Sequence, residues 1–324
     1  MKVLITKPIP AVGIEMIWNS GHEVTIIEEN SILSKEELIE QSKQHDAIIC
    51  VGGYKLDKNY LNECRHLKVI ALFSVGYNNV DVEEATRLHI PVGNTPDVLS
   101  NATADTAFLL MLAASRKAFY MYQQILQNNW KDFHATANLG IELTNKTLGI
   151  FGLGRIGFEL AKRCRGAYSM NVIYHNRSAN KEAEKELNAT LVSFDGLLAK
   201  SDVLSVHASL TPETKEAFNL NAFSKMKSSA IFINTARGGL HNEADLTKAL
   251  QEGLIWGAGL DVTNPEPMLP GNPLLQIPSV AVLPHIGSST VEARNGMAKY
   301  AAENIIAGLE GKRLPHLINE KVYQ

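Results

Sequence analysis

The sequence predicts an α/β protein with parallel β-sheets that are covered by helices on both faces. Short runs of apolar and β-branched residues alternate with helical patterns along most of the chain, and such alternation favours parallel sheets. A glycine motif of the form G-x-G-x-x-G directly follows one of the apolar runs and opens a helical pattern. The 324 residues suffice for one large domain or two ordinary domains with buried cores.

Residues 1–95 form the first alternating segment. Its helical patterns include Lys35–Gln44, and its predicted strands are Val3–Thr6, Val24–Ile27, Ala47–Val51 and Val69–Leu72. Two glycine-containing loops, 51–53 and 74–79, come directly after strands, where open α/β sheets place their ligands. Backbone N–H groups in either loop could hold a carboxylate, and the alternative that both loops are only tight turns stays open.

The pattern changes after Asn94-Thr95-Pro96. We expect one long helix over Thr103–Tyr122, because its Ala, Leu and Met residues form more apolar surface than a solvated helix tolerates. This helix would be buried between domains or at a subunit contact. Residues 130–145 are expected to form an irregular, polar connector.

The second alternating segment begins with the predicted strand Thr147–Phe151. It contains a predicted helix over Glu243–Gln251, and a final helix over Val291–Gly308 could return to the first segment. The further predicted strands are Asn171–Tyr174, Asp202–Ser205, Ala230–Asn234, Gly257–Asp261 and Val280–Leu283. Internal repeats and low-complexity tracts are absent, so the two segments share a pattern but not a sequence.

The glycine motif consists of Gly152, Gly154 and Gly157. The first glycine allows a sharp turn, the second lets the backbone approach a pyrophosphate, and the third lets the helix pack closely on the strand. The phosphates of a dinucleotide would then meet a helix N-terminus, where N–H groups and the macrodipole favour negative charge. A purely structural glycine turn is the alternative, but the flanking strands favour a dinucleotide site.

The segment His175-Asn176-Arg177-Ser178 ends the second strand of this unit, where a contact to the adenosine ribose is expected. An acidic side chain there would bind the ribose 2′-hydroxyl, whereas an arginine accommodates a 2′-phosphate. Because Asp and Glu are absent from this segment, the sequence favours NADP over NAD. In the alternative, Arg177 is only a solvated cation and Asn176 contacts the ribose.

The composition excludes several classes of function. A formal net charge of -3 and a pI of about 6.4 provide no basic field for nucleic acid or an anionic membrane. Apolar stretches fall short of the roughly 18 residues that a membrane span needs, and the apolar run before Pro8 is too short for a signal peptide. Cys50, Cys64 and Cys164 show neither zinc spacing nor a disulfide framework. We therefore expect a cytoplasmic protein without a metal site.

Two basic residues are candidates for chemistry on a 2-ketoacid or 2-hydroxy acid with a nicotinamide cofactor. Such chemistry needs a cation for the carboxylate and the polarised carbonyl, and a proton donor and acceptor for the C2 oxygen. Arg237 follows a strand beside a pair of glycines, and its guanidinium suits a carboxylate or a developing alkoxide. His285 also follows a strand, and an imidazole can give and take a proton near neutral pH.

Two acidic residues complete the set of candidates. Glu266 lies between Pro265 and Pro267, which stiffen the backbone around the carboxylate. A hydrogen bond from His285 to Glu266 would stabilise the imidazolium form and fix the ring tautomer. In the alternative, Glu266 belongs to a rigid surface turn. Asp261 ends an apolar strand, and it could either face the nicotinamide or cap the turn that follows.

Five motifs carry a family resemblance. The series TLGIFGLGRIG, SLTPET, INTARGG, GLDVTNPEP and LPHIGSST, in this order, resembles the D-2-hydroxyacid dehydrogenases over essentially the whole chain. Within that family, the segments SVGYNNVD, NTPDVLSNATAD and GLDVTNPEP look most like the glyoxylate/hydroxypyruvate reductases. The resemblance implies that Arg237 binds substrate, that His285 is the acid/base and that Glu266 is its partner.

The resemblance also implies contacts to the ligands. The amides of Val75 and Gly76 would hold the substrate carboxylate, and Ser288 would line the site. In addition to Gly152, Gly157 and Asn176, the implied cofactor contacts are Gly154, Arg155, Ile156, Arg177, Ser178, Ser209, Thr235, Asp261 and Gly287.

The fold implied by the resemblance has two doubly wound parallel-sheet domains, with a Rossmann cofactor domain inserted into a flavodoxin-like substrate domain. Residues 1–99 and 289–324 would form the substrate-binding domain, and residues 100–288 the dinucleotide-binding domain. Hinges are expected near 94–100 and 284–288. Dimerisation through the inserted domain is expected as well.

The activity implied by the resemblance is NADPH-dependent reduction of glyoxylate or hydroxypyruvate to the D-2-hydroxy acid. A bulkier substrate such as 2-ketogluconate, or a non-catalytic, co-repressor-like binding function, stays open. The chain departs from the family at residues 101–105, at residues 207–209, where a common proline is absent, and at His241-Asn242, where many relatives carry Val-Asp. These departures leave Arg237, Glu266 and His285 untouched, so they concern specificity rather than the reaction.

Overall fold

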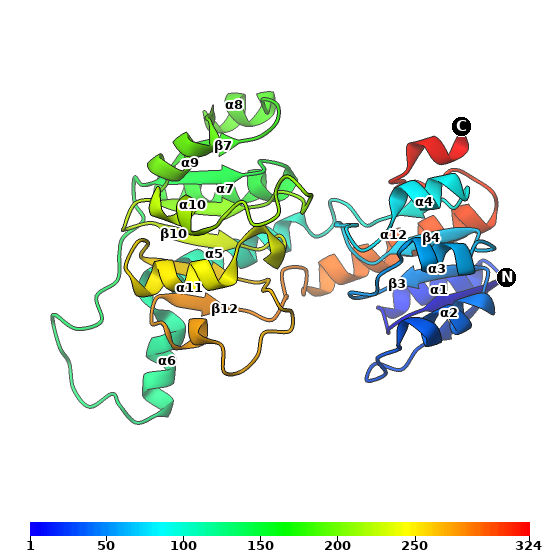
Figure 1. Ribbon diagram of the computed structural model, residues 1–324, viewed down its shortest axis with the longest axis horizontal. Coiled ribbons are helices and arrows are strands. Elements are labelled where there is room, and N and C mark those ends of the chain that lie inside the picture. Colours follow the sequence, from blue (N-terminus) through cyan, green and yellow to red (C-terminus); the bar gives the residue numbers. More distant parts are fainter. The chain divides into compact units, whose positions relative to one another are not determined.

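The computed structural model describes all 324 residues, and the chain divides into two compact units. One unit consists of Met1–Leu99 together with Ser288–Gln324, and the other consists of Ser100–Gly287 (Figure 1). The second unit therefore interrupts the first in the sequence. The predicted α/β class with parallel sheets is confirmed, because every pair of neighbouring strands in both sheets is parallel.

The first unit contains a five-stranded sheet with the order β2-β1-β3-β4-β5. Its strands are β1 Lys2–Ile5, β2 Glu23–Ile26, β3 Ala47–Cys50, β4 Val69–Leu72 and β5 Val92–Gly93. Every residue of β3 and β4 is buried, as expected for continuous apolar runs that are covered on both faces of a parallel sheet. The edge strand β2 is largely exposed.

The helices of the first unit include segments from both ends of the chain. They are α1 Ala11–Asn19, α2 Lys35–Lys43, α3 Lys58–Glu63, α4 Val82–Arg87, α12 Val291–Leu309 and the short η3 Glu320–Tyr323. The helix α12 packs on α1 and β4. A Cβ on Gly13 would lie 2.6 Å from the carbonyl oxygen of Ala298, so this glycine permits α1 and α12 to approach closely. The last long helix thus packs on elements that are formed by the first 99 residues.

The second unit contains a seven-stranded sheet with the order β12-β11-β10-β9-β6-β7-β8. Its strands are β6 Thr147–Phe151, β7 Asn171–His175, β8 Thr190–Leu191, β9 Val203–Val206, β10 Ile231–Asn234, β11 Gly257–Leu260 and β12 Val280–Val282. The strand order reverses between β6 and β9, and ligands bind outside the carboxyl ends of strands at such a switch point. The glycine motif directly follows β6, so it lies at this point.

The helices of the second unit connect these strands. They are α5 Ser100–Arg116, α6 Ala118–Leu126, α7 Arg155–Tyr168, α8 Lys181–Leu187, α9 Phe194–Lys200, α10 Leu220–Ser224, η1 Gly238–Leu240, α11 Glu243–Gln251 and η2 Pro273–Gln276. The helix α5 packs against β10, β11 and β12 and buries nine of its residues.

The prediction of one long helix over Thr103–Tyr122 is wrong, because the helix is interrupted at Lys117. This residue has φ +54° and separates α5 from α6. The carbonyl oxygen of Ser115 accepts a hydrogen bond from the N–H of Ile141, so the returning chain satisfies one of the terminal carbonyls of α5. A left-handed lysine is uncommon, and the segment contains neither Gly nor Pro that would mark the interruption.

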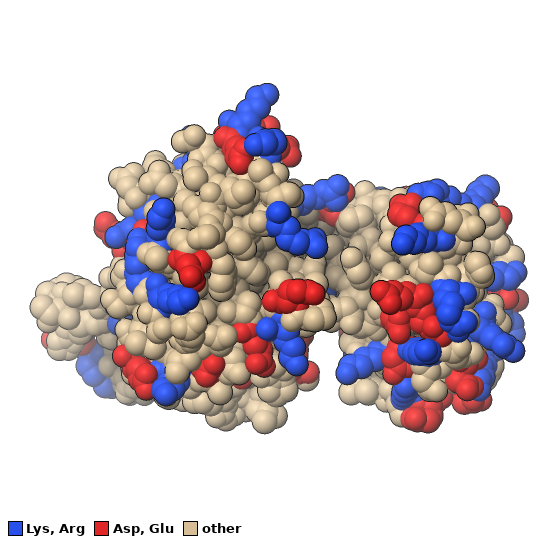
Figure 2. Space-filling view, turned by 45° about the horizontal axis from the view of Figure 1, so that its top comes forward, with Lys and Arg blue, Asp and Glu red and all other residues tan.

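One face of the molecule carries mixed charge. Lys and Arg side chains are interspersed with Asp and Glu side chains on the face shown in Figure 2. This distribution agrees with the small net charge of the chain. None of the helices combines the length and the hydropathy needed to cross a membrane.

Candidate active site

The glycine turn has the geometry that the sequence predicts for it. Gly152 has φ +89°, and a Cβ there would lie 2.6 Å from the backbone nitrogen of Ala208. Gly154 precedes the first residue of α7, and a Cβ there would meet no atom within 4 Å. A Cβ on Gly157 would lie 3.0 Å from Ile150. The open space at Gly154 and the N-terminus of α7 fit a pyrophosphate.

The segment after β7 supports this turn. Asn176 accepts a hydrogen bond from the N–H of Leu153 at 2.6 Å through Oδ1, and it donates through Nδ2 to the carbonyl oxygen of Leu153 at 3.1 Å. The sequence predicted Asn176 as a cofactor contact, and its amide here ties the end of β7 to the glycine turn. Arg177 and Ser178 follow directly and are exposed.

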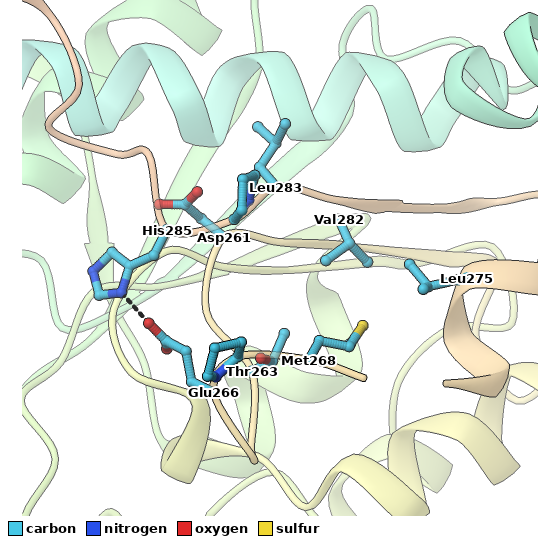
Figure 3. Close-up of a pocket in the computed structure, with 10 residues that line it drawn as sticks. Asp261, Thr263, Glu266, Met268, Leu275, Val282, Leu283 and His285 are labelled. Atoms are coloured by element: carbon cyan, nitrogen blue, oxygen red, sulfur yellow. Dashed lines mark hydrogen bonds and ion pairs between the residues drawn. The ribbon is translucent and has the colours of Figure 1, made fainter. Parts of the chain in front are cut away.

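His285 and Glu266 form a hydrogen-bonded pair. The distance between His285 Nδ1 and Glu266 Oε1 is 2.5 Å, and Figure 3 shows both side chains at one cavity. Side-chain exposures of 47% and 43% leave both groups accessible to a ligand. Because the carboxylate accepts from Nδ1, the other ring nitrogen of His285 is available to a substrate.

The charge of Arg237 interacts with the charge of Glu266. Burial lowers the pKa of Arg237, and the charge of Glu266 opposes this shift. Burial alone would raise the pKa of Glu266, but the hydrogen bond and charge of His285, together with the charge of Arg237, lower it below its usual value. The three residues therefore combine two basic groups with one ionised carboxylate.

Close packing holds the Arg237 turn against the loop that leads to Glu266. A Cβ on Gly238 would lie 1.9 Å from the carbonyl oxygen of Thr263, so only glycine fits there. The N–H of Asn264 donates to Glu243 at the start of α11 at 3.0 Å. These contacts join segments that are distant in the sequence, and the sequence alone carries no signal for them.

Asp261 ties the end of β11 to the backbone that follows His285. This carboxylate is buried and accepts hydrogen bonds from the N–H groups of Ile286 at 2.8 Å and Gly287 at 2.7 Å. Burial raises the pKa of Asp261, although both N–H groups oppose the shift. Asp261 thus connects two neighbouring strand ends.

The hydroxyl of Thr235 is buried directly after β10 and has no hydrogen-bond partner in the protein. A group of a bound cofactor could form a hydrogen bond with it.

A cavity of about 400 Å³ adjoins the histidine–glutamate pair. It is lined by Asp261, Thr263, Glu266, Pro267, Met268, Leu275, Val282, Leu283, Pro284 and His285. In Figure 3 the ionisable side chains lie at one end, and Leu275 and Met268 lie at the other. The ionisable lining residues Asp261, Glu266 and His285 were predicted as site residues, whereas the apolar lining residues were not.

Comparison with known proteins identifies the family. Residues 108–287 match the family described as "D-isomer specific 2-hydroxyacid dehydrogenase, NAD binding domain". The glyoxylate reductase of Thermococcus litoralis is 42% identical over 325 residues, which cover 99% of this chain and 97% of that protein. The glyoxylate reductase of Pyrococcus furiosus is 41% identical, with 99% and 96% covered. The chain belongs to the D-2-hydroxyacid dehydrogenase family.

Solved structures agree with this assignment. A glyoxylate reductase from Paecilomyes thermophila has a TM-score of 0.87 at 34% identity, with 99% of each chain covered. An NADPH-dependent glyoxylate/hydroxypyruvate reductase from Sinorhizobium meliloti, in complex with NADP and malonate, has a TM-score of 0.84 at 31% identity, with 99% of this chain and 97% of that chain covered. The family resemblance is confirmed, and the protein is a 2-ketoacid reductase that uses a nicotinamide cofactor.

The remaining predicted ligand contacts of this dehydrogenase lie in both units. Arg155 and Ile156 begin α7, and the carbonyl oxygen of Ser209 accepts a hydrogen bond from Thr214. Val75 and Gly76 follow β4 in the first unit, where Asn94 donates to the Val75 carbonyl and Ser74 to that of Gly76. Ser288 is the first residue of the returning segment of the first unit. Their roles in binding remain predictions.

The variant Glu266→Gln is expected to lower kcat/KM for 2-ketoacid reduction on the order of 10- to 100-fold. The carboxylate of Glu266 accepts a hydrogen bond from His285 Nδ1 and so holds the ring in one orientation. The neutral amide of glutamine accepts a weaker hydrogen bond, so the ring is held less firmly. The measurement is steady-state kcat/KM at neutral pH. Glu303→Gln is the matched control, because Glu303 pairs with His316 in the first unit. An unchanged kcat/KM in Glu266→Gln would contradict a role of the pair in the reaction.

Proposed function

We propose that this dehydrogenase reduces a small 2-ketoacid, glyoxylate or hydroxypyruvate, to the D-2-hydroxy acid with NADPH. The proposal depends on the hydrogen bond between His285 and Glu266 and on the interaction of the Arg237 charge with Glu266. These residues follow β12, β11 and β10, which are neighbours in the sheet, so they share one sheet edge. The full-length relatives named glyoxylate reductase support the substrate class.

Each residue of the set has a defined role in the proposed reaction. When bound, the nicotinamide supplies a hydride to C2 of the substrate. His285 donates a proton from its second ring nitrogen to the C2 oxygen, while Glu266 holds the ring through Nδ1. Arg237 binds the carboxylate and stabilises the negative charge that develops on the C2 oxygen.

A substrate panel tests this proposal. Steady-state reduction of glyoxylate, hydroxypyruvate, pyruvate and 2-ketogluconate should give the highest kcat/KM for glyoxylate or hydroxypyruvate. The apolar end of the 400 Å³ cavity favours a second candidate, a bulkier 2-ketoacid, because it offers more space than a two-carbon acid fills. A clear preference for 2-ketogluconate would establish that candidate. The absence of turnover with every 2-ketoacid would refute the proposal in favour of a binding protein.

The proposed preference for NADPH depends on Arg177 at the end of β7. Arg177→Gln should raise KM for NADPH on the order of 10- to 100-fold and leave KM for NADH nearly unchanged, because it removes a charge-assisted hydrogen bond to the 2′-phosphate. The matched control is Lys181→Gln, which removes a nearby exposed cation that pairs with Glu184. A wild-type preference for NADH, or equal effects on both cofactors, would contradict this assignment.

We also propose a cytoplasmic homodimer. All three cysteines are reduced and buried, which fits a reducing compartment. The second unit exposes a group of large apolar side chains on α6 and the connector that follows it: Tyr122, Ile125, Leu126, Trp130, Phe133 and Leu139. An apolar surface of this kind is typical of a subunit contact. Sedimentation velocity of the purified enzyme tests it, and a monomer at micromolar concentration would overturn the proposal.

A further inference from the structure

The turn that carries Arg237 is closed by a buried amide side chain. Asn234, the last residue of β10, is fully buried, and its Oδ1 accepts a hydrogen bond from the N–H of Ala236 at 2.9 Å. Its Nδ2 donates to the carbonyl oxygen of Arg237 at 2.9 Å. Asn234 thus binds the backbone on both sides of the peptide that joins Ala236 and Arg237.

The second hydrogen of this amide is held by His241. Asn234 Nδ2 lies 3.0 Å from His241 Nδ1. Because Oδ1 must face a backbone donor and Nδ2 must face a backbone acceptor, the orientation of the amide is fixed. His241 Nδ1 is therefore an acceptor, and the proton of the neutral ring is on Nε2, which has no partner in the protein.

The surroundings of His241 keep the ring in this neutral form. The side chain is fully buried, and its ring packs edge-on against Phe232 at 5.8 Å between centroids. The residues on either side of His241 form backbone hydrogen bonds with Phe218. The N–H of Phe218 donates to the Leu240 carbonyl, and the N–H of Asn242 donates to the Phe218 carbonyl. Burial lowers the pKa of His241 to about 4.

We propose that His241 is a positioning residue that fixes Arg237 through Asn234. This inference rests on the proposed role of Arg237 in binding the substrate and its developing charge. Without an acceptor at Nδ1, one hydrogen of the Asn234 amide is left unsatisfied in a buried site. The amide can then turn away from the Arg237 carbonyl, and the guanidinium loses its fixed position relative to Glu266 and His285. His241 itself contacts neither substrate nor cofactor in this proposal.

Two substitutions of similar size separate positioning from packing. His241→Leu fills part of the space without an acceptor, whereas His241→Asn can place an amide oxygen where Nδ1 lies. We expect kcat/KM for 2-ketoacid reduction to fall on the order of 10- to 100-fold in His241→Leu, with both kcat and KM affected. In His241→Asn it should return to within roughly threefold of wild type. The Kd for NADPH and the thermal midpoint show whether each variant is folded.

A double-mutant cycle tests whether the effect passes through Arg237. In an Arg237→Lys background, His241→Leu should cause little further loss, since residues that act as one unit are not additive. Additive losses, or equal losses in His241→Leu and His241→Asn with a native thermal midpoint, would overturn the inference.

The tautomer of His241 provides a readout that does not need turnover. In 15N-edited NMR spectra of the wild-type protein at neutral pH, one buried histidine should have an unprotonated Nδ1 and a protonated Nε2. Both signals should be absent from the spectrum of His241→Leu, which assigns them to His241. An Nδ1-protonated ring would overturn the proposed role of His241 even if the enzyme is active. If no 2-ketoacid is reduced but the predicted tautomer is present, the proposed function fails, whereas the hydrogen bond from Asn234 to His241 is still supported.

Discussion

His285→Gln is expected to lower kcat for 2-ketoacid reduction by ~10³-fold or more, because general acid catalysis typically contributes ~10²–10⁴-fold. Glutamine can still reach toward Glu266, but it cannot deliver a proton to the C2 oxygen. Binding of NADPH, measured by fluorescence titration, should be retained, since the glycine turn lies at a different strand end. The measurement is kcat at saturating substrate and cofactor.

A second histidine–glutamate pair supplies the control for this variant. His316 lies 3.3 Å from Glu303 in the first unit and stacks on Tyr300. His316→Gln should leave kcat close to that of wild type, although it can lower stability. Retained kcat in His285→Gln would remove His285 from the reaction, and equal losses in both variants would indicate a general effect of the substitution.

Arg237→Lys is expected to lower kcat/KM on the order of 10²-fold while NADPH binding is kept. Lysine preserves the charge but lacks the planar fork that binds a carboxylate and an alkoxide together. The loss should appear in both kcat and KM, because Arg237 is proposed to contact the substrate and its developing charge. Steady-state kinetics at saturating NADPH provide the measurement.

The matched control is Arg313→Lys, an exposed arginine that pairs with Glu320. This variant should retain the kinetics of the wild type. If Arg237→Lys also retained wild-type kcat/KM, Arg237 would not bind the reacting group, and its proximity to Glu266 would have only an electrostatic role.

Most strands could be predicted because parallel strands that are covered on both faces are continuous apolar runs. β4 and β6 lie at the predicted residues, and β10 differs from its prediction by a single residue at its start. The strands β5 and β8 have only two residues each, which is too short for a recognisable pattern. The helix interruption at Lys117 could not be predicted, because neither Gly nor Pro marks it and Ile141, which bonds to the Ser115 carbonyl, lies far along the chain.

The placement of the candidate residues at strand ends could be predicted, whereas the backbone groups that their neighbourhood binds could not. Arg237 and His285 follow strand ends and belong to residue types with specific chemistry, so the sequence singles them out. Asn234 and Asp261 act through hydrogen bonds to backbone groups 2 to 26 residues away. Their partners become known only once the strands are placed side by side.

The separation of the chain into two units has a consequence for enzyme engineering. His285, Glu266 and Arg237 all reside within Ser100–Gly287, whereas the predicted carboxylate-binding loop at Val75 and Gly76 belongs to the other unit. Substitutions in that loop therefore leave the hydrogen bond between His285 and Glu266 in place. A library of loop variants can accordingly be screened in directed evolution with an unchanged second unit.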